Sequence, residues 1–368
     1  MTPPSRRPWL RSRSGDPRRR VRTTGLLTIG AVAIVVLATT VGAAGPGSGA
    51  VAHAGVRPAR GPDLSGVTLT VGVVSATSSA SQDIRLASGA FAKTPYGLEW
   101  ATFPTSTGAL EALNAGALDL AVDIQATAPL FAQANAKTPW TRRSAPIRLI
   151  AAAQPPPGGL GIFVRTGSGI RSMADLKGKK VAYSRGSNSQ YYWAVAAEQA
   201  RLRAGTVEEV QLATAEARPA FLSGAVDALV TDRRIMLNDL SSGKVEVLAD
   251  GRPDVPVYTL TVARTDALRD RKTSAAIGEF LARLAKSKRW LPKHQAEAAA
   301  IYVSAARMTP ENAAAAVVEL PVQQRVIDRA VVDDLQDQMT VFFAAGVVNA
   351  DPKVAVVVDR RFDADITG

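Results

Sequence analysis

Cysteine is absent from this chain, and histidine occurs only twice in its 368 residues. The absence of cysteine excludes disulfides, thiol nucleophiles, iron–sulfur clusters and thiolate metal sites. His53 and His294 lie far apart in the sequence, and we expect both to be solvated, so we expect no metal, no cofactor and no Ser–His–Asp catalysis. Aromatic residues make up 5% of the chain, too few for a surface that stacks single-stranded nucleic acid.

Acidic residues are outnumbered, and the formal net charge is +12. Most of the excess lies near the start of the chain, where residues 1–24 hold eight arginines against Asp16 and contribute +7. Arg57 and Arg60 contribute +2, which leaves +3 for the rest of the chain. A charge of +3 is ordinary for a soluble domain of this size, so the sequence gives little support to a nucleic-acid partner.

An uncharged apolar run from Gly25 to Ala44 follows the arginines, and Ala50–Ala54 then offers a small-residue cleavage site. This order is typical of an export signal. The run approaches the roughly 20 residues that span a bilayer, so cleavage and retention as a membrane anchor both stay open. In either case we expect the rest of the chain to be extracytoplasmic, in the periplasm or at the cell surface. Ser5–Arg11 resembles a twin-arginine motif, which also leaves the export route open.

Strand-like and helix-like segments alternate beyond residue 66. Val67, Leu69, Val71 and Val73 recur with period two and predict a strand, and the Ser/Thr-rich residues after them predict the start of a helix. Further strands are expected at 98–103, 118–122, 181–183 and 227–231, and helices at 84–91, 109–115, 277–284 and 327–342. This alternation indicates an α/β fold with parallel sheets and helices on their faces.

The proline and glycine cluster Pro155–Gly159 interrupts this pattern and predicts a crossing between two α/β lobes. Gly243–Pro256 offers a second crossing, so the two segments together predict a hinge. The expected organisation is a basic segment (1–24), a signal peptide or membrane anchor (25–54), a linker (55–65), a first lobe (66–155 plus 252–368) and a second lobe (156–251).

Several short motifs carry a family resemblance through their joint order and spacing. They are the strand at 67–73, LEWATFP at 98–104, LEALNAGALD at 110–119, ADLKGKKV at 174–181, GSN at 186–188, AFLSGAVDA at 220–228, and Trp290 with QAEAA at 295–299. In this order they resemble the aliphatic-sulfonate branch of the substrate-binding proteins of ABC transporters, over residues 66 to 362.

The resemblance implies a type II periplasmic binding protein fold, with two α/β lobes, a hinge and an inter-lobe cleft. It implies no catalysis. A protein of this kind captures a small organic anion, with an aliphatic sulfonate as the leading class, and presents it as a monomer to a membrane permease and its ATPase.

Candidate ligand-binding residues follow from the loops that join strands to helices. Open α/β sheets bind ligands at the carboxyl ends of their strands, and helix N-termini there favour anions. The candidates are Ser78, Thr107, Gly108, Gln125, Ser187, Asn188, Ser189 and Arg233. The serines and Asn188 could equally be simple helix caps, because capping selects the same residue types.

Two departures from the family pattern leave the ligand open. Thr231–Arg234 stands where the family tends to show an aromatic residue followed by Asp-Pro, and an added arginine could pair with an anion. Asp123 would instead disfavour an anion or select an amine. The alternatives are therefore the same fold binding nitrate, a thiamine precursor or another nitrogenous solute, or a membrane-tethered sensory module without transport. A thiamine-pathway enzyme on this fold would need metal and histidine chemistry that the chain lacks.

Overall fold

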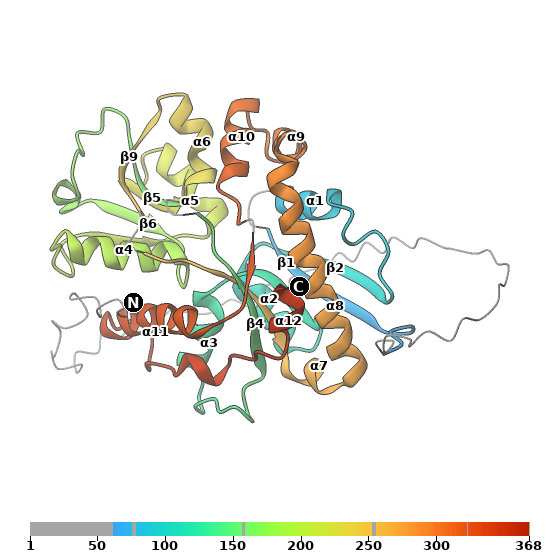
Figure 1. Ribbon diagram of the computed structural model, residues 1–368. Helices are drawn as coiled ribbons and strands as arrows, with labels where there is room; N and C mark the ends of the chain where they lie inside the picture. Colours follow the sequence, from blue (N-terminus) through green and yellow to red (C-terminus); the bar gives the residue numbers. More distant parts are fainter. Residues whose placement is uncertain (1–61, 76–78, 157–158, 252–254, 322, 368) are drawn as a thin grey trace, which may run out of the picture.

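The computed structural model describes residues 62–75, 79–156, 159–251, 255–321 and 323–367. The export segment, His53 and Ser78 lie outside the described residues. Within the described residues no helix is both long enough and apolar enough to cross a membrane. The chain forms two β-sheets, each covered by helices (Figure 1).

The first lobe is built on a six-stranded sheet of order β11-β4-β10-β3-β1-β2. Its strands are β1 (Thr68–Val74), β2 (Gly97–Phe103), β3 (Leu120–Gln125), β4 (Ile147–Ala153), β10 (Thr259–Arg264) and β11 (Gln324–Arg325). β1 pairs in parallel with β2 and β3, whereas β10 runs antiparallel to both β3 and β4. All seven residues of β4 are buried, as expected for a strand with a neighbour on each side and helices on both faces.

The second lobe is built on a five-stranded sheet of order β7-β6-β8-β5-β9. Its strands are β5 (Leu160–Arg165), β6 (Lys180–Tyr183), β7 (Glu208–Gln211), β8 (Ala228–Asp232) and β9 (Val245–Asp250). β6 pairs in parallel with β7 and β8, and β5 runs antiparallel to β8 and β9. The chain passes between the sheets twice, from β4 to β5 and from β9 back to β10. The predicted α/β fold with two lobes is confirmed, but the prediction of parallel sheets is wrong, because both sheets also contain antiparallel pairs.

Helices cover both faces of each sheet. The first lobe carries α1 (Ala80–Ala87), α2 (Ser106–Asn114), α3 (Thr127–Ala134), α7 (Thr265–Arg269), α8 (Arg271–Trp290), α9 (Gln295–Ala306), α10 (Pro310–Val318), α11 (Arg329–Ala344) and α12 (Asp363–Thr367). The second lobe carries α4 (Asn188–Gln199), α5 (Thr214–Leu222) and α6 (Arg233–Ser241). Phe280 of α8 packs with Leu69 and Val71 on one face of the first sheet, and Leu335 and Phe342 of α11 belong to the core on its other face.

Two helix pairs join the lobes on either side of the molecule. On one side α4 of the second lobe lies against α11 of the first (Figure 1), where Tyr191 and Phe342 have ring centroids 5.9 Å apart. On the other side Asn312 of α10 donates to Asn238 and Ser241 of α6, each at 2.8 Å. Leu237 of α6 also belongs to a hydrophobic cluster with Ala313 and Val317 of α10, so apolar side chains contribute to both contacts.

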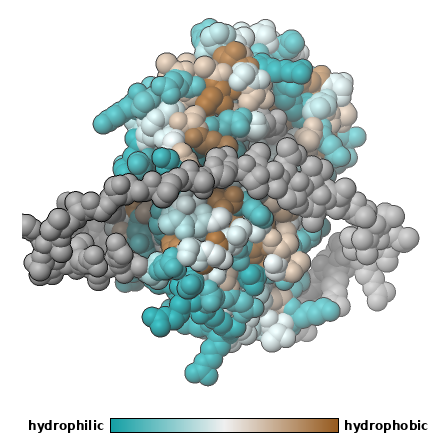
Figure 2. Space-filling view, turned by 90° about the vertical axis from the view of Figure 1, so that its right-hand side faces the viewer, coloured by the Kyte–Doolittle hydropathy of each residue, from teal (hydrophilic) through white to brown (hydrophobic). Residues whose placement is uncertain are grey.

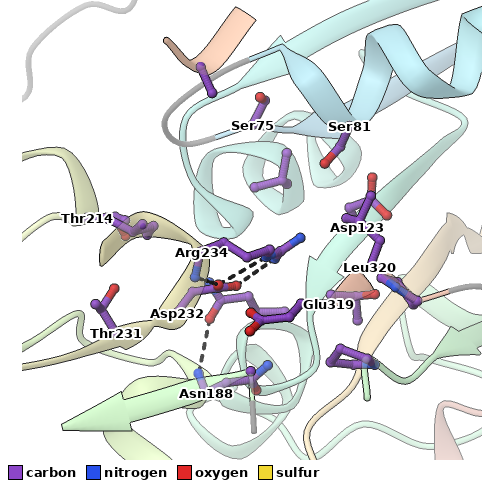
Figure 3. A pocket seen from close by; sticks show the side chains of 18 of the residues that line it. Ser75, Ser81, Asp123, Asn188, Thr214, Thr231, Asp232, Arg234, Glu319 and Leu320 are labelled. Atoms are coloured by element: carbon purple, nitrogen blue, oxygen red, sulfur yellow. Dashed lines mark hydrogen bonds and ion pairs between the residues drawn. The ribbon is translucent and has the colours of Figure 1, made fainter. Parts of the chain in front are cut away.

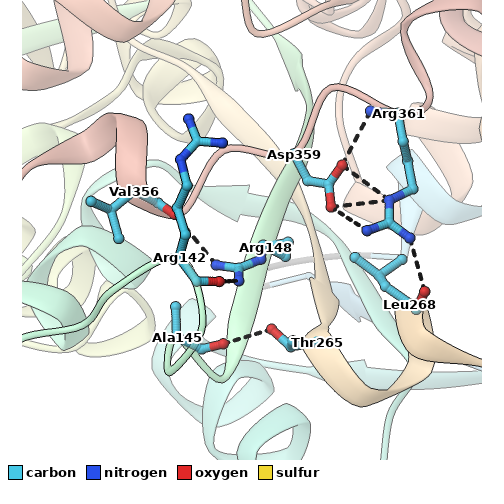
Figure 4. A network of polar contacts seen from close by, with 8 residues as sticks. All are labelled: Arg142, Ala145, Arg148, Thr265, Leu268, Val356, Asp359 and Arg361. Carbon is cyan, nitrogen blue, oxygen red and sulfur yellow. Dashed lines mark hydrogen bonds and ion pairs between the residues drawn. The ribbon is translucent and has the colours of Figure 1, made fainter.

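A polar network connects residues 356–361 with Arg148 of β4 and Leu268 of α7 (Figure 4). Arg361 forms an ion pair with Asp359 and also donates to the carbonyl of Leu268. Arg148 is buried and donates to the carbonyls of Arg142 and Val356. These carbonyl contacts satisfy a buried guanidinium that has no carboxylate within hydrogen-bond distance among the described residues.

The surface distributes apolar and polar residues unevenly. On the face shown in Figure 2, hydrophobic residues gather in the upper half and the lower edge is hydrophilic. The large exposed hydrophobic side chains are Leu86, Val247, Val303, Val318 and Phe343. They come from different elements, which is ordinary for a soluble domain.

The core of the first lobe generates a stability prediction. Phe280 is fully buried and its ring lies 5.2 Å from that of Phe91 and 5.7 Å from that of Trp100. We expect Phe280→Ala to lower the free energy of unfolding by about 3–5 kcal/mol, because it removes apolar burial and leaves a cavity. Phe343→Ala, at a side chain that is 46% exposed, should cost less than about 1 kcal/mol. Urea unfolding of both variants measures the difference, and equal losses would contradict this description of the core.

Candidate functional site

A cavity of about 760 Å³ lies between the two lobes, where β3 and β8 end and several helices begin (Figure 3). The first lobe lines it with residues of α1, β3, α8, α9 and the segment after α10, and the second lobe with the starts of α4, α5 and α6. The polar lining residues include Ser75, Ser81, Arg85, Asp123, Gln125, Asn188, Ser189, Thr214, Arg218, Thr231, Asp232, Arg234, Lys288 and Glu319. This position matches the expectation that open α/β sheets bind ligands beyond the carboxyl ends of their strands.

A β-bulge in β3 brings Asp123 to this cavity. Ala121 pairs with Val262 and Ile124 pairs with Leu260, so β3 has one residue more than β10 between these pairs. Asp123 has a φ of 58°, the left-handed conformation of a bulge residue. The extra residue puts Ala121 and Ile124 into the same core, which ordinary alternation would not allow. The strand therefore continues to Gln125, whereas the sequence predicted that it ends at residue 122.

Asp123 forms an ion pair with Arg85 of α1. Arg85 Nη2 donates to Asp123 Oδ2 at 2.5 Å, and the two side chains are 5% and 23% exposed. Burial alone would raise the pKa of Asp123, but the charges of Arg85, Lys288 and Arg234 outweigh it and hold the pKa below its ordinary value. The carboxylate is thus ionised and neutralised by the chain itself.

Asp232 and Arg234 form a second ion pair at the start of α6. Asp232 caps the helix by accepting from the backbone N–H of Arg234 at 2.9 Å. The Arg234 side chain returns to the same carboxylate through Nε at 3.0 Å and Nη2 at 2.6 Å (Figure 3). Burial would lower the pKa of Arg234, but the charge of Asp232 raises it above its ordinary value. The positive end of α6 is therefore occupied by the chain's own carboxylate.

The N-terminus of α4 is only partly occupied. Ser187 caps the helix by accepting from the N–H of Gln190, and its hydroxyl donates to the carbonyl of Ser184 at 2.6 Å. Gln125 Oε1, from the first lobe, accepts from the N–H of Asn188 at 3.0 Å. Ser189 lines the cavity, and neither its backbone N–H nor its hydroxyl has a hydrogen-bond partner in the described part of the chain. Two unused donors at a helix N-terminus thus adjoin the cavity.

The structure brings four of the predicted site residues to the cavity: Gln125, Ser187, Asn188 and Ser189. Thr107, Gly108 and Arg233 are not among its lining residues. Gly108 donates its N–H to the cap residue Thr105 of α2, and Thr107 is exposed. Arg233 Nε lies 3.7 Å from Glu319 Oε1, whereas its neighbour Arg234 lines the cavity. Successive helical residues point about 100° apart, so only one of the two arginines can take that position.

Sequence reasoning missed several residues of the site. Asp232 had a readable signal, since an aspartate at the junction of a strand and a helix is a strong N-cap. Lys288 and Arg85 had none, because they reach the cavity from helical faces that only the tertiary packing defines. In the described residues no group of three His, Asp or Glu side chains could hold a metal ion. His294, which we expected to be solvated, is only partly exposed, since its ring stacks on Trp290 and its Nδ1 lies 3.0 Å from Glu297 Oε1.

Two curated proteins are similar to part of this chain in sequence. A protein of Escherichia coli (strain K12) provisionally named as an aliphatic sulfonates-binding protein is 36% identical over 156 residues, which are 42% of this chain. A protein of Haemophilus influenzae provisionally named as a thiamine biosynthesis protein is 33% identical over 148 residues, 39% of this chain. The aligned part of this chain spans about half, 46%, of the length of each relative.

Among solved structures, the alkanesulfonate-binding protein SsuA of Xanthomonas axonopodis pv. citri, bound to MOPS, superposes with a TM-score of 0.71. The match is 22% identical and covers 82% of this chain and all of that chain. The two sheets, the two crossings and the cleft between them therefore define a protein with the periplasmic binding protein fold. The family described as NMT1/THI5 like matches residues 102–298, and the chain belongs to that family.

The Arg85–Asp123 pair generates a prediction for stability and its pH dependence. Asp123→Asn keeps a residue that tolerates positive φ but leaves Arg85 buried without its counter-charge, so it should cost about 3 kcal/mol of unfolding free energy at pH 7. Because folding lowers the pKa of Asp123, the stabilisation is present above the ordinary value of about 3.9 and is lost as the pH falls through the folded-state value. The difference in unfolding free energy between wild type and Asp123→Asn should therefore become smaller below about pH 4.

Urea unfolding from pH 7 to pH 3 measures this gap. The control is Asp266→Asn, which removes an exposed ion pair with Arg269 whose side chains are 68% and 65% exposed. It should cost less than about 1 kcal/mol. If Asp123→Asn lowers the unfolding free energy no more than Asp266→Asn does, the buried ion pair stabilises the protein no more than the exposed one.

Proposed function

We propose that this chain is the extracytoplasmic solute-binding protein of an ABC importer, and that it captures a small organic anion, with an aliphatic sulfonate as the leading class. The observation that carries the proposal is the inter-lobe cavity, which offers unused hydrogen-bond donors while its carboxylates are paired with arginines. The relative named for aliphatic sulfonates supports the ligand class. Binding without catalysis is part of the proposal.

The ligand's anionic group would meet donors from both lobes. From the second lobe come the N–H and hydroxyl of Ser189 at the start of α4. From the first lobe comes Ser81 in the first turn of α1, where no side chain caps the helix. Exposed amides at a helix start favour an anion, and the effect strengthens when water is excluded. The apolar part of the ligand would contact Ile84, Leu284 and Leu320, which also line the cavity.

Closure of the lobes would link occupancy to shape. We propose that residues 66–155 with 252–368 move as one lobe and residues 156–251 as the other. The contacts that cross the cleft include Gln125 Oε1 with the N–H of Asn188 and the Thr127 hydroxyl with the carbonyl of Gly186 at 2.5 Å. A ligand that binds only the closed arrangement shifts the population toward it, and a permease with its ATPase would recognise that arrangement.

One observation favours a second ligand class. The relative named for thiamine biosynthesis is 33% identical over its aligned part, so a thiamine precursor or another nitrogenous solute is the alternative ligand on the same fold. In that case Asp123 or Asp232 would exchange its arginine for the cationic group of the ligand. Attachment of the protein to the membrane through residues 25–44 is compatible with either ligand.

A thermal-shift panel tests the ligand class. The panel contains alkanesulfonates, taurine, sulfate, phosphonates, nitrate, amino acids and pyrimidines, in buffers free of sulfonates. A ligand at 100 times its dissociation constant adds about 2.7 kcal/mol of stability, so we expect a clear rise in melting temperature with alkanesulfonates. A rise with pyrimidines alone would establish the alternative, and no rise with any solute would contradict the proposed function.

A substitution at the start of α4 tests the site. Ser189→Ala removes an unused hydroxyl at the cavity, and we expect it to weaken sulfonate binding by about 1–3 kcal/mol with little change in melting temperature. Ser304→Ala, on the exposed face of α9, is the control and should bind as the wild type does. Calorimetric titration of both variants measures the effect, and equal affinities would remove Ser189 from the site.

A further inference from the structure

Lys288 is a cation of the cavity that the chain itself leaves without a counter-charge. It lies in the last turn of α8 and lines the cavity together with Leu284, Ser287 and Leu291 of the same region. Its side chain is partly buried, and its ammonium group has no hydrogen bond or ion pair with any described residue. A lysine withdrawn from water without a partner lowers the stability of the protein that carries it.

The remaining charges of the cavity are paired. Arg85 lies against Asp123 and Arg234 against Asp232, and Arg218 Nε lies 2.7 Å from Asp239 Oδ2. Glu319 pairs with Arg233. Arg307 also lines the cavity, but it is exposed to solvent at the end of α9. Among the charges that the cavity withdraws from water, Lys288 therefore leaves one positive charge uncompensated.

The groups facing Lys288 come from three other elements. They are Asp123 of β3, Arg85 of α1 and Arg234 of α6. Burial is the main cause that lowers the pKa of Lys288 to about 8, and the charges of Arg85 and Arg234 lower it further, whereas Asp123 opposes them. The carboxylate does not restore the ordinary value because Arg85 already neutralises it at 2.5 Å. An anion placed beside Lys288 would be the counter-charge that this position lacks.

We propose that Lys288 is the residue that supplies the charge for holding the ligand's anionic group, and that the cavity accordingly takes a ligand with one net negative charge. This inference rests on the proposed function. Ser189 then orients the anionic group through hydrogen bonds, and Lys288 provides the electrostatic attraction. Binding of a sulfonate should depend on pH, because the free protein must hold a proton on Lys288 for the charges to balance.

Calorimetric titration with 1-butanesulfonate between pH 7 and pH 9 tests the assignment, since the sulfonate keeps its charge over this range. The wild-type affinity should fall about tenfold, as expected for a group whose pKa is about 8 in the free protein and higher in the complex. Lys288→Met should bind about tenfold to 100-fold more weakly at pH 7 and show no pH dependence. Lys288→Arg should keep most of the affinity at pH 7 and also lose the pH dependence, because arginine stays charged.

Lys286→Met is the matched control, since Lys286 lies on the same helix and is exposed outside the cavity. It should bind as tightly as wild type, with the same pH dependence. The melting temperature separates a binding role from a structural one: Lys288→Met removes an uncompensated buried charge and should melt at or above the wild-type temperature.

Each outcome bears on one of the two proposals. If wild type binds butanesulfonate and Lys288→Met binds it within twofold, or keeps the pH dependence, the assignment of Lys288 is overturned and the proposed function stands. If Lys288→Met melts well below wild type, Lys288 has a structural role and the assignment is overturned as well. If wild type binds no anion of the panel, the proposed function itself fails.

Discussion

The buried ion pair between Arg85 and Asp123 is the interaction on which the rest of the cavity depends. It occurs at a β-bulge, so the strand that carries Asp123 turns a polar side chain into the cleft and still keeps Ile124 in the core. It also docks α1 on the end of the first sheet. Because the pair is neutral, the carboxylate does not repel an anion, and it compensates the charge of Lys288 only in part. A single contact thus sets the position of a helix, the course of a strand and the charge of the cavity.

Side chains of the protein also occupy some of the helix N-termini at the cavity. The helices that begin at the cavity differ in how far the chain fills their N-termini: a side chain caps α4 and α6, whereas none caps α1 or α5. Asp232 occupies the start of α6, and Gln125 occupies the first amide of α4. In our proposal the amide of Ser189 would orient the ligand through a hydrogen bond, and the ammonium of Lys288 would attract it by its charge.

Much of the fold could be predicted from the sequence, because alternation and turn residues report local structure. The strand at 67–73, the crossing at Pro155–Gly159 and the two-lobed α/β architecture agree with the structure.

The residues of the site were harder to predict from the sequence than the fold. Four predicted residues lie at or just after the end of a strand and do line the cavity, namely Gln125, Ser187, Asn188 and Ser189. Thr107, Gly108 and Arg233 have the same local pattern but do not line it. Which of two adjacent arginines faces a cavity depends on how a whole helix is rotated, and Lys288 reaches the cleft from a helix with no loop motif nearby. Such information resides in tertiary packing.

The joints between the lobes explain how such a cleft could respond to a small molecule. On one side Tyr191 and Phe342 belong to a continuous hydrophobic core, which strongly resists separation because apolar area would be exposed. On the other side Asn312 donates to Asn238 and Ser241, and Leu237 of α6 also belongs to a hydrophobic cluster with Ala313, Ala316 and Val317 of α10. Lys288 and Arg234 lie on opposite lobes, so their mutual repulsion favours the open state until an anion neutralises it. In the proposed role of Lys288, the charge that binds the ligand would also favour closure of the lobes over it.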